Sequence, residues 1–323
     1  MKKVLAMILA LVMIITCLVS PAMASPAKST PAAVESQTAT TVDADGAVSM
    51  DVSADVTAQK KVTIIVELEG ETPYRQSGDL QLAAVGYDSQ MAAMAKAESS
   101  IEATLNRPIE VDSRFTLLFN GFSFEGESWM IDAINKMDGV RAFEAPMFEL
   151  VTPTDETEMD LTPSMSKSTN LTGAIETWDL GYSGEGMAVA IIDTGIRQTH
   201  EAFSVMPENG KIDLEYLRDV YTQYGDKMHG GSLQDINDIY YSEKLPFNWD
   251  YFDHDAVPNH TNTDHGTHVA GIAAGNNGVD FYGVAPDAQV VTLQVFEDDG
   301  GASFATLMTA LEDCVYLGVD AVN

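Results

Sequence analysis

The sequence predicts an α/β fold built on a parallel sheet, preceded by a smaller α+β unit. Two nearly continuous apolar runs, residues 187–192 and 290–295, have the composition of strands that are buried on both faces. An amphipathic helix at 303–317, with Ser303 as its N-cap and Gly318 as its C-terminal stop, follows the second run. Another short apolar stretch begins at 319. Such alternation of strands and helices favours a parallel sheet with crossover helices. We place this pattern in residues 171–323 and expect the chain before it to be organised differently.

The first 60 residues are predicted to be a leader and a linker. Lys2 and Lys3 precede a short apolar run, and Ala22-Met23-Ala24 has the small-x-small pattern of a cleavage site, so residues 1–24 are predicted to be a secretory signal peptide. Lipid attachment at Cys17 is the alternative, disfavoured because the preceding threonine is larger than such processing usually requires. Residues 25–60 are rich in Ser, Ala, Thr and Val, and we expect a disordered linker there.

Residues 61–150 are predicted to fold as a small α+β unit. The order of elements is that of a ferredoxin-like β-α-β-β-α-β fold: a strand at 62–66, a helix at 89–105, a hairpin at 115–124 that turns at Asn120-Gly121, a helix at 129–137 and a strand at 140–150. Residues 151–170 are rich in Thr, Ser, Pro, Asp and Glu, and we expect an exposed linker that proteases can cleave.

Charge and cysteine content exclude several classes of partner. Acidic residues outnumber basic ones 49 to 17, which gives a formal charge of −32 and argues against nucleic acid and anionic membrane surfaces as partners. The two cysteines are Cys17, inside the leader, and Cys314, so no intrachain disulfide is expected. No long apolar run follows the leader, and we expect no membrane span in the mature chain.

Two residues are candidates for chemistry. Asp193 ends the strand that begins at 187, and functional groups gather at the carboxyl edge of open parallel sheets. His265 opens a helix that either Thr263 or Asp264 caps, and the glycines inside that helix indicate close backbone packing. A metal site formed by His265, His268 and Asp264 is a weaker alternative. Taken singly, each residue also has an ordinary structural explanation.

The segments around these residues together resemble the subtilisin family of serine proteases. Residues 178–186 and 189–196 are similar to its aspartate region, and His265-Gly266-Thr267-His268-Val269-Ala270-Gly271 is similar to its histidine region. Gly283-Val284-Ala285-Pro286 and Asp320-Ala321-Val322-Asn323 also match, in the family's order. The 72-residue spacing from Asp193 to His265 and the Tyr- and Asp-rich segment 240–262 are similar to the cell-envelope proteinases of Gram-positive bacteria, the lactocepin and C5a-peptidase type.

The resemblance implies a secreted or cell-envelope serine endopeptidase that acts on proteins or peptides. His265 would be the general base and Asp193 the residue that orients it, and no cofactor is required for this chemistry. The family's oxyanion-hole asparagine and Gly-Thr-Ser-Met-Ala nucleophile segment are absent from the sequence and are expected beyond Asn323, so the chain alone is expected to be inactive. Ser303 is better explained as a helix cap. The alternative function is a non-catalytic secreted inhibitor or binding fragment.

The resemblance also gives the small unit a role. Subtilisin-like precursors carry a ferredoxin-like propeptide, so residues 61–150 would be an intramolecular inhibitor whose last strand enters the cleft, and residues 151–170 would hold the processing site. Strands near 293–296 and 300–303 would pair with an extended substrate. Structural calcium is compatible with the resemblance, and the sequence assigns no metal ligands.

Overall fold

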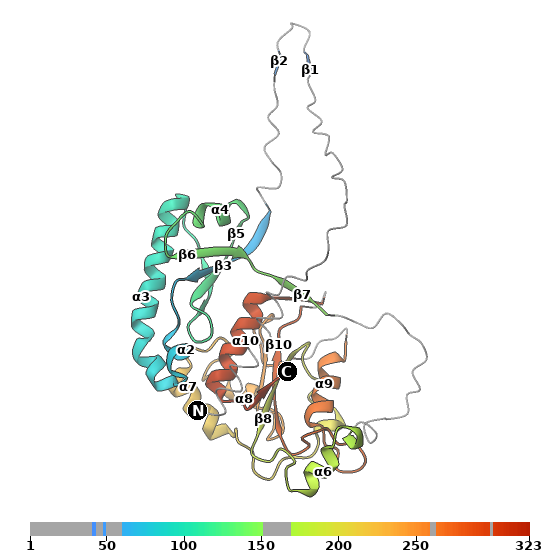
Figure 1. Ribbon diagram of the computed structural model, residues 1–323. Helices are drawn as coiled ribbons and strands as arrows, with labels where there is room; N and C mark the ends of the chain where they lie inside the picture. The colour runs from blue at the N-terminus through green and yellow to red at the C-terminus, as the bar shows by residue number, and fades with distance from the viewer. Residues whose placement is uncertain (1–40, 43–47, 50–59, 151–168, 259–262, 298–299) are drawn as a thin grey trace.

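A computed structural model describes residues 41–42, 48–49, 60–150, 169–258, 263–297 and 300–323. The predicted signal peptide, nearly all of the predicted first linker and most of the predicted second linker lie outside these residues. Two short strands, β1 (Thr41–Val42) and β2 (Val48–Ser49), pair antiparallel. The rest forms two parts that lie side by side, and we call them the N-terminal unit (60–146) and the C-terminal unit (169–323) (Figure 1).

The N-terminal unit is a four-stranded antiparallel sheet with helices on one face. Its sheet order is β4-β5-β3-β6. The side chains of Val62, Ile64 and Val66 pack with Met94 and Ile101 of the long helix, because alternate strand residues point to the same face. The elements are β3 (Lys61–Leu68), α2 (Pro73–Ser77), α3 (Leu80–Leu105), β4 (Val111–Phe115), β5 (Gly121–Glu127), α4 (Trp129–Ile134) and β6 (Val140–Glu144).

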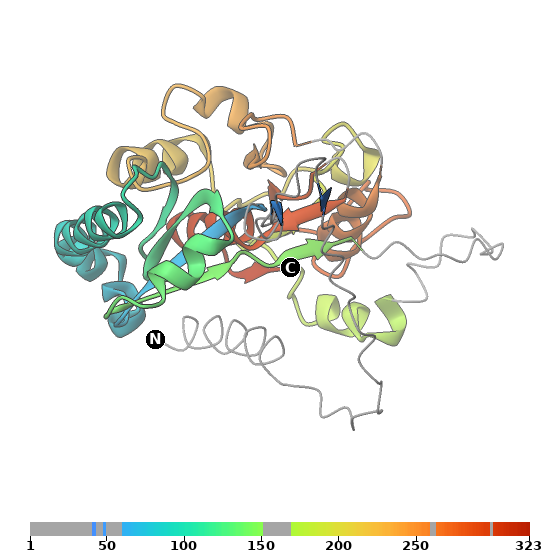
Figure 2. The same ribbon diagram turned by 90° about the horizontal axis from the view of Figure 1, so that it is seen from above.

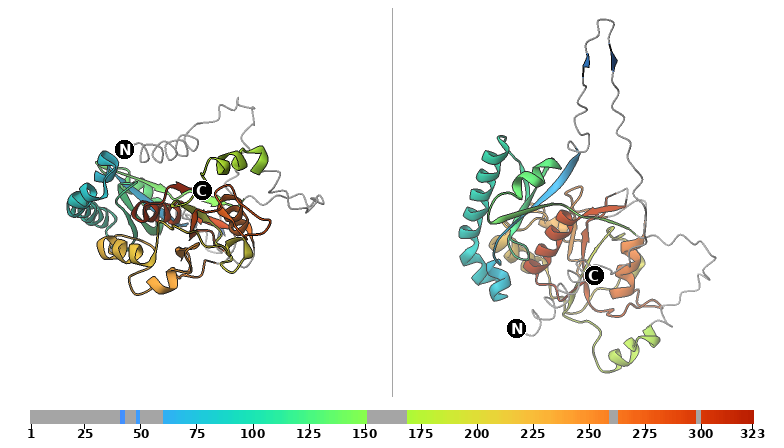
Figure 3. Two further views of the ribbon diagram at one scale, coloured as in Figure 1. Left: turned by 90° about the horizontal axis from the view of Figure 1, so that it is seen from below. Right: turned by 45° about the horizontal axis from the view of Figure 1, so that its top comes forward.

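The opposite face of this sheet packs on the C-terminal unit. Ile65, which lies between the helix-facing positions of β3, is buried together with Phe115, Ala305 and Met308. The order of layers is therefore α3, the antiparallel sheet and then the C-terminal unit, as seen from above (Figure 2). Views from below and at a tilt show the same adjacency of the two units (Figure 3).

The long helix begins earlier than the sequence predicted. It starts at Leu80 and not near 89, with Asp79 as its N-cap, whose carboxylate accepts the backbone N–H groups of Gln81 and Leu82. Gly86 lies inside this helix, and a Cβ on it would lie 2.5 Å from Cγ of Pro73. The glycine thus allows α3 to approach α2 and does not end the helix.

Two further boundaries in the N-terminal unit differ from prediction. The hairpin does not turn at Asn120-Gly121, because residues 116–120 connect β4 to β5 and Gly121 is already a strand residue, packed so closely that a Cβ would overlap the carbonyl oxygen of Val66. The predicted last strand, 140–150, is two strands, because Pro146 interrupts it. The second of these, β7 (Met147–Glu149), pairs with the C-terminal unit.

The C-terminal unit confirms the predicted α/β fold with a parallel sheet. The sheet order is β12-β8-β10-β9, and all three pairings are parallel. The elements are α6 (Ala174–Asp179), β8 (Ala188–Asp193), the 3-10 helix η2 (Glu201–Phe203), α7 (Leu214–Tyr224), α8 (Ile236–Ile239), β9 (Phe247–Asp250), α9 (His265–Ala274), β10 (Gln289–Gln294), β11 (Gly301–Ser303), α10 (Phe304–Leu317) and β12 (Ala321–Val322).

Both faces of this sheet are buried, as the apolar runs predicted. On β8, Ala188 and Ala190 join the core that includes α7 and α10, whereas Ile191 packs against Ala270 and Ala274 of α9. Among the described residues, no helix is long and apolar enough to span a membrane.

Helix α10 departs from the amphipathic helix that the sequence predicted. Ser303 caps it by accepting the N–H of Thr306 at 3.0 Å, and Gly318 ends it with a φ of 64°, as expected. However, Glu312 and Asp313, which belong to the predicted polar side, are both fully buried. The helix lies between the parallel sheet and the N-terminal unit, so both of its sides face protein.

Candidate active site

The two candidate residues meet at the carboxyl edge of the parallel sheet. Asp193 is the last residue of β8 and is in register with Gln294, the last residue of β10. Helix α9 begins at the same edge with His265 as its first residue. The sequence predicted both placements separately, and the fold brings the two side chains together across 72 residues of chain.

The imidazole of His265 contacts the carboxylate of Asp193 directly. Nδ1 lies 2.7 Å from Oδ1, and the N–H of Thr194 donates to the same oxygen at 2.7 Å. An ionised carboxylate accepts hydrogen bonds only, so this contact favours a proton on Nδ1 and leaves the lone pair on Nε2. The histidine side chain is 39% exposed and the aspartate 9%, so the imidazole reaches solvent while the carboxylate is shielded.

Two hydrogen bonds join the first turn of α9 to the segment that follows β8, and a third lies within the entry to the helix. The N–H of Gly266 donates to Oγ1 of Thr194 at 3.0 Å, and the N–H of Arg197 donates to Oγ1 of Thr267 at 2.9 Å. The N–H of His265 donates to Oγ1 of Thr263 at 3.1 Å. Of the two predicted caps, Asp264 occupies the N-cap position, but its side chain makes no capping bond and instead pairs with Arg197 at 2.6 Å.

Gly266 permits this close approach of helix and strand. A Cβ on it would overlap the carbonyl oxygen of Gly195 and lie 3.2 Å from Oδ1 of Asp193. The glycine that costs helix stability thus seats the histidine against its carboxylate. At Gly271, further along the same helix, a Cβ would meet only the ring of Phe281 at 3.4 Å, an ordinary contact.

This contrast gives a prediction. Gly266→Ala should lower the stability of the chain by about 3 kcal/mol, because the added methyl group meets backbone that cannot move aside, and we expect a melting temperature lower by roughly 6 °C or more. Gly271→Ala is the matched control, expected to lie within about 1 kcal/mol of the wild type. Thermal unfolding followed by circular dichroism measures both, and equal effects would show that Gly266 is not a packing requirement.

Comparison with known proteins identifies the family of this part of the chain. The model of the subtilase family matches residues 184–323, which contain both site residues. Residues 184–323 belong to the subtilase family. We call them the subtilase region.

Relatives extend the similarity beyond the subtilase region. The minor extracellular protease Vpr of Bacillus subtilis (strain 168) is 30% identical over 279 residues, which cover 83% of this chain and 30% of that protein. The PII-type proteinase of Lacticaseibacillus paracasei is 27% identical over 248 residues, which cover 72% of this chain and 12% of that protein. The chain thus spans less than a third of the length of either relative.

A solved structure is also similar. Fervidolysin from Fervidobacterium pennivorans, described as a keratinolytic enzyme related to subtilisin, matches with a TM-score of 0.46 and 15% identity. The match covers 84% of this chain and 36% of the fervidolysin chain.

One strand from outside the subtilase region lies on it. Strand β7 pairs antiparallel with β11, with Phe148 opposite Ala302. The N–H of Leu150 donates to the carbonyl oxygen of Gly300, and the N–H of Phe304 donates to that of Pro146, each at 2.9 Å. An extended peptide that adds to a free strand makes hydrogen bonds of this kind.

The structure gives no support to the alternative metal site. Within the described residues, no group of three or more His, Cys, Asp or Glu side chains is arranged to hold a metal ion. His268 is exposed and lines a recess of about 210 Å³ with Arg197 and His200. The carboxylate of Asp264 in the same recess is already paired with Arg197.

Sequence reasoning missed a second polar centre, at the contact between the two units. One oxygen of Glu312 accepts the N–H groups of Leu117 and Leu118 at 2.7 and 2.8 Å, and the other accepts that of Thr116 at 3.0 Å. These three residues connect β4 to β5 in the N-terminal unit. The available signal was the pair Glu312-Asp313 inside an apolar helix, because buried carboxylates require partners.

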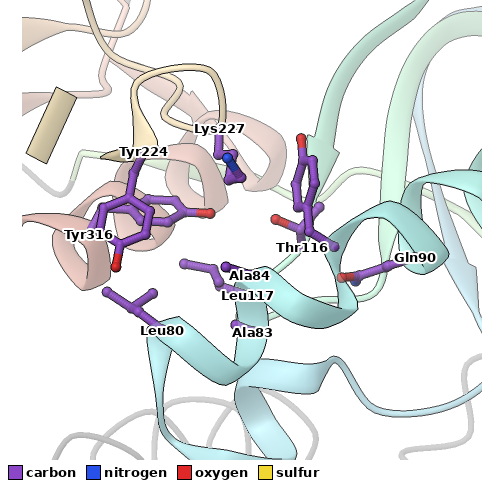
Figure 4. Close-up of a pocket in the computed structure, with 10 residues that line it drawn as sticks. Leu80, Ala83, Ala84, Gln90, Thr116, Leu117, Tyr224, Lys227 and Tyr316 are labelled. Atoms are coloured by element: carbon purple, nitrogen blue, oxygen red, sulfur yellow. The ribbon is translucent and has the colours of Figure 1, made fainter. Parts of the chain in front are cut away.

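Apolar contacts surround this centre. Figure 4 shows that the start of α3 faces Tyr224 and Tyr316 of the C-terminal unit across a small pocket, which Thr116 and Leu117 also line. At the rim, the ammonium group of Lys227 lies 4.9 Å from the centre of the Tyr87 ring. The N-terminal unit is thus held by packing around one fully buried carboxylate.

Proposed function

We propose that the chain is the N-terminal part of the precursor of a secreted serine endopeptidase, with His265 as general base and Asp193 as the residue that orients it. The observation that carries the proposal is the 2.7 Å contact between Nδ1 and Oδ1 at the carboxyl edge of the sheet, within the subtilase region. Protein and peptide substrates follow from that family. Vpr is named an extracellular protease, which supports secretion.

The geometry allows one proton-transfer mechanism. With a proton on Nδ1 held by Asp193, the Nε2 lone pair of His265 would take the proton of a serine hydroxyl as it attacks the peptide carbonyl. The imidazole would then return that proton to the leaving amine, while the Asp193 carboxylate stabilises the imidazolium. The family's nucleophile segment is absent from the sequence, and in the proposed precursor the serine would come from chain that follows Asn323.

We further propose that the N-terminal unit is an inhibitory propeptide of ferredoxin-like shape. Two contacts support this: β7 occupies the edge of β11, where an extended substrate would pair, and Glu312 binds three backbone N–H groups of the unit. A polypeptide bound along β11 would exclude substrate from the same strand. The processing site would follow β7, within residues 151–170.

The experiment uses the polypeptide that includes the coding sequence after Asn323. We expect it to hydrolyse a general protein substrate and to react with a serine-directed fluorophosphonate, whereas residues 1–323 should show neither property. A stop codon directly after Asn323, or a longer polypeptide that is unreactive, would favour a non-catalytic secreted inhibitor or binding protein instead.

A further inference from the structure

His229 lies in the contact between the two units. It follows α7 in the C-terminal unit, and its ring packs on that of Phe115 in the N-terminal unit, with ring centroids 6.1 Å apart. The side chain is 14% exposed. Its Nε2 is buried and forms no hydrogen bond among the described residues. A buried polar atom without a partner carries a free-energy cost that needs an explanation.

The unpaired nitrogen points to the carboxylate that holds the N-terminal unit. Nε2 lies 3.6 Å from Oε2 of Glu312, an ion-pair distance that is too long for a hydrogen bond. The same oxygen accepts the N–H of Thr116. The neighbouring carboxylate, Asp313, accepts the N–H groups of His229 and Gly230. A proton on His229 would therefore place a positive charge beside two buried carboxylates.

Other charged and titratable groups face His229 across a cavity of about 400 Å³ between the units. The N-terminal unit contributes Asp112 and Glu125 to the cavity lining, and the C-terminal unit contributes Glu297, His254 and Tyr251. The hydroxyl of Tyr251 donates to Asp313. Docking thus brings two further carboxylates of the N-terminal unit toward His229 and shields its contact with Glu312 from water.

We propose that His229 is a proton-operated latch, which strengthens the docking of the N-terminal unit on Glu312 when it is protonated and weakens it when it is neutral. This proton-dependent docking would regulate inhibition of the enzyme only under the proposed function, in which the N-terminal unit is an inhibitory propeptide. Separation of the units would expose the His229–Glu312 pair to water, where ion pairs contribute little. The proton therefore favours the docked state.

The direction of the pH dependence follows from the docked structure. Burial acts to lower the pKa of His229, but its contact with Glu312 and the charge of Asp313 outweigh burial and raise the pKa above its ordinary value. A histidine whose pKa is raised in the docked state stabilises docking fully at pH values below its ordinary pKa, about 6.5. Its contribution is lost as the pH rises through the raised value. Mild acid should hold the unit, and neutral to alkaline pH should loosen it.

Asp112 is a further titratable group at this contact. Its pKa is raised by burial and then by the charges of Glu125 and Glu110. Glu125 and Glu110 belong to the same unit as Asp112, so their part of this shift does not depend on docking.

The test is amide hydrogen exchange at Thr116, Leu117 and Leu118 in the full chain between pH 5.5 and 8.5, with each rate divided by that of an unstructured peptide at the same pH. In the wild type, we expect the protection of these amides to fall at least about fivefold across this range, the low end of usual coupling between sites. In His229→Gln, whose side chain is neutral at every pH, the pH dependence of this protection should vanish. His268→Gln, an exposed site on α9, should keep it.

Two further readouts keep the outcomes separate. The paired amides of β3 and β5 should stay protected in every variant, which shows that the N-terminal unit is folded, and the ring-proton NMR signal of His229 should titrate with the midpoint of the exchange data. The proposed role of His229 alone would be overturned if the amides of residues 116–118 were protected equally at every pH. It would also be overturned if the pH dependence of their protection persisted in His229→Gln. Amides that exchange at the unstructured rate at every pH would overturn the docked propeptide as well.

Discussion

Replacing His265 by alanine, in the polypeptide that includes the coding sequence after Asn323, is expected to lower kcat by about 10⁶, the loss that subtilisin shows for its own catalytic histidine. The side chain is the only group placed to move a proton between the nucleophile and the leaving amine in the proposed mechanism. Asp193→Ala should cost less, about 10⁴ to 10⁵. The aspartate orients and stabilises the imidazole but accepts no proton itself. Steady-state hydrolysis of a peptide substrate measures both values.

A second readout is independent of turnover. In residues 1–323, Nδ1 of His265 lies 2.7 Å from Oδ1 of Asp193, and the tautomer with its proton on Nδ1 should give a strongly deshielded proton NMR signal. Asp193→Ala should abolish that signal, and the exposed control His268→Gln should leave it unchanged. A signal that survives Asp193→Ala, or a larger loss of kcat in Asp193→Ala than in His265→Ala, would show that the roles are assigned wrongly.

Replacing Glu312 by alanine is expected to destabilise the docking of the N-terminal unit by about 3 kcal/mol or more. The change leaves three N–H groups in the contact without their acceptor, and each unsatisfied buried donor costs about 1–3 kcal/mol. Glu312→Gln keeps one carbonyl oxygen and should lose less. Glu215→Ala, at an exposed position of α7, is the control expected to have no effect.

Exchange at residues 116–118 also measures this effect, because these amides should lose about a hundredfold of protection or more for a loss of 3 kcal/mol. The β3 and β5 amides serve as the internal reference, since the core of α3, α4 and the helix-facing strand residues does not include Glu312. Full protection at 116–118 in Glu312→Ala would mean that apolar packing alone holds the unit.

Local sequence patterns predicted most elements near the active site. The apolar run at 187–192 gave a strand that ends at Asp193, and Ser303 and Gly318 marked the ends of α10 correctly. These signals work because backbone hydrogen bonding and capping depend on neighbouring residues. The contact of Asp193 with His265 was inferred only through resemblance, because no local pattern links residues 72 positions apart.

The errors arose where a distant segment changed the meaning of a local signal. The helix predicted from residue 89 begins at Leu80, and Gly86 inside it allows contact with Pro73. Asn120-Gly121 suggested a two-residue turn, yet its glycine lies in β5, against the backbone of Val66. The strand at 140–150 divides at Pro146 because its second half pairs with β11 of the other unit.

The sequence by itself determined the parallel-sheet α/β class of the second unit, the strand that ends at Asp193 and the two side chains at the candidate active site. Only the tertiary structure decided that Glu312 is buried, that it binds the backbone of residues 116–118, and that His229 lies beside it. The physical reason is burial: a carboxylate on a helix looks solvent-exposed in sequence until another unit covers it. The cost of removing it from water can be offset only by donors far away in the chain.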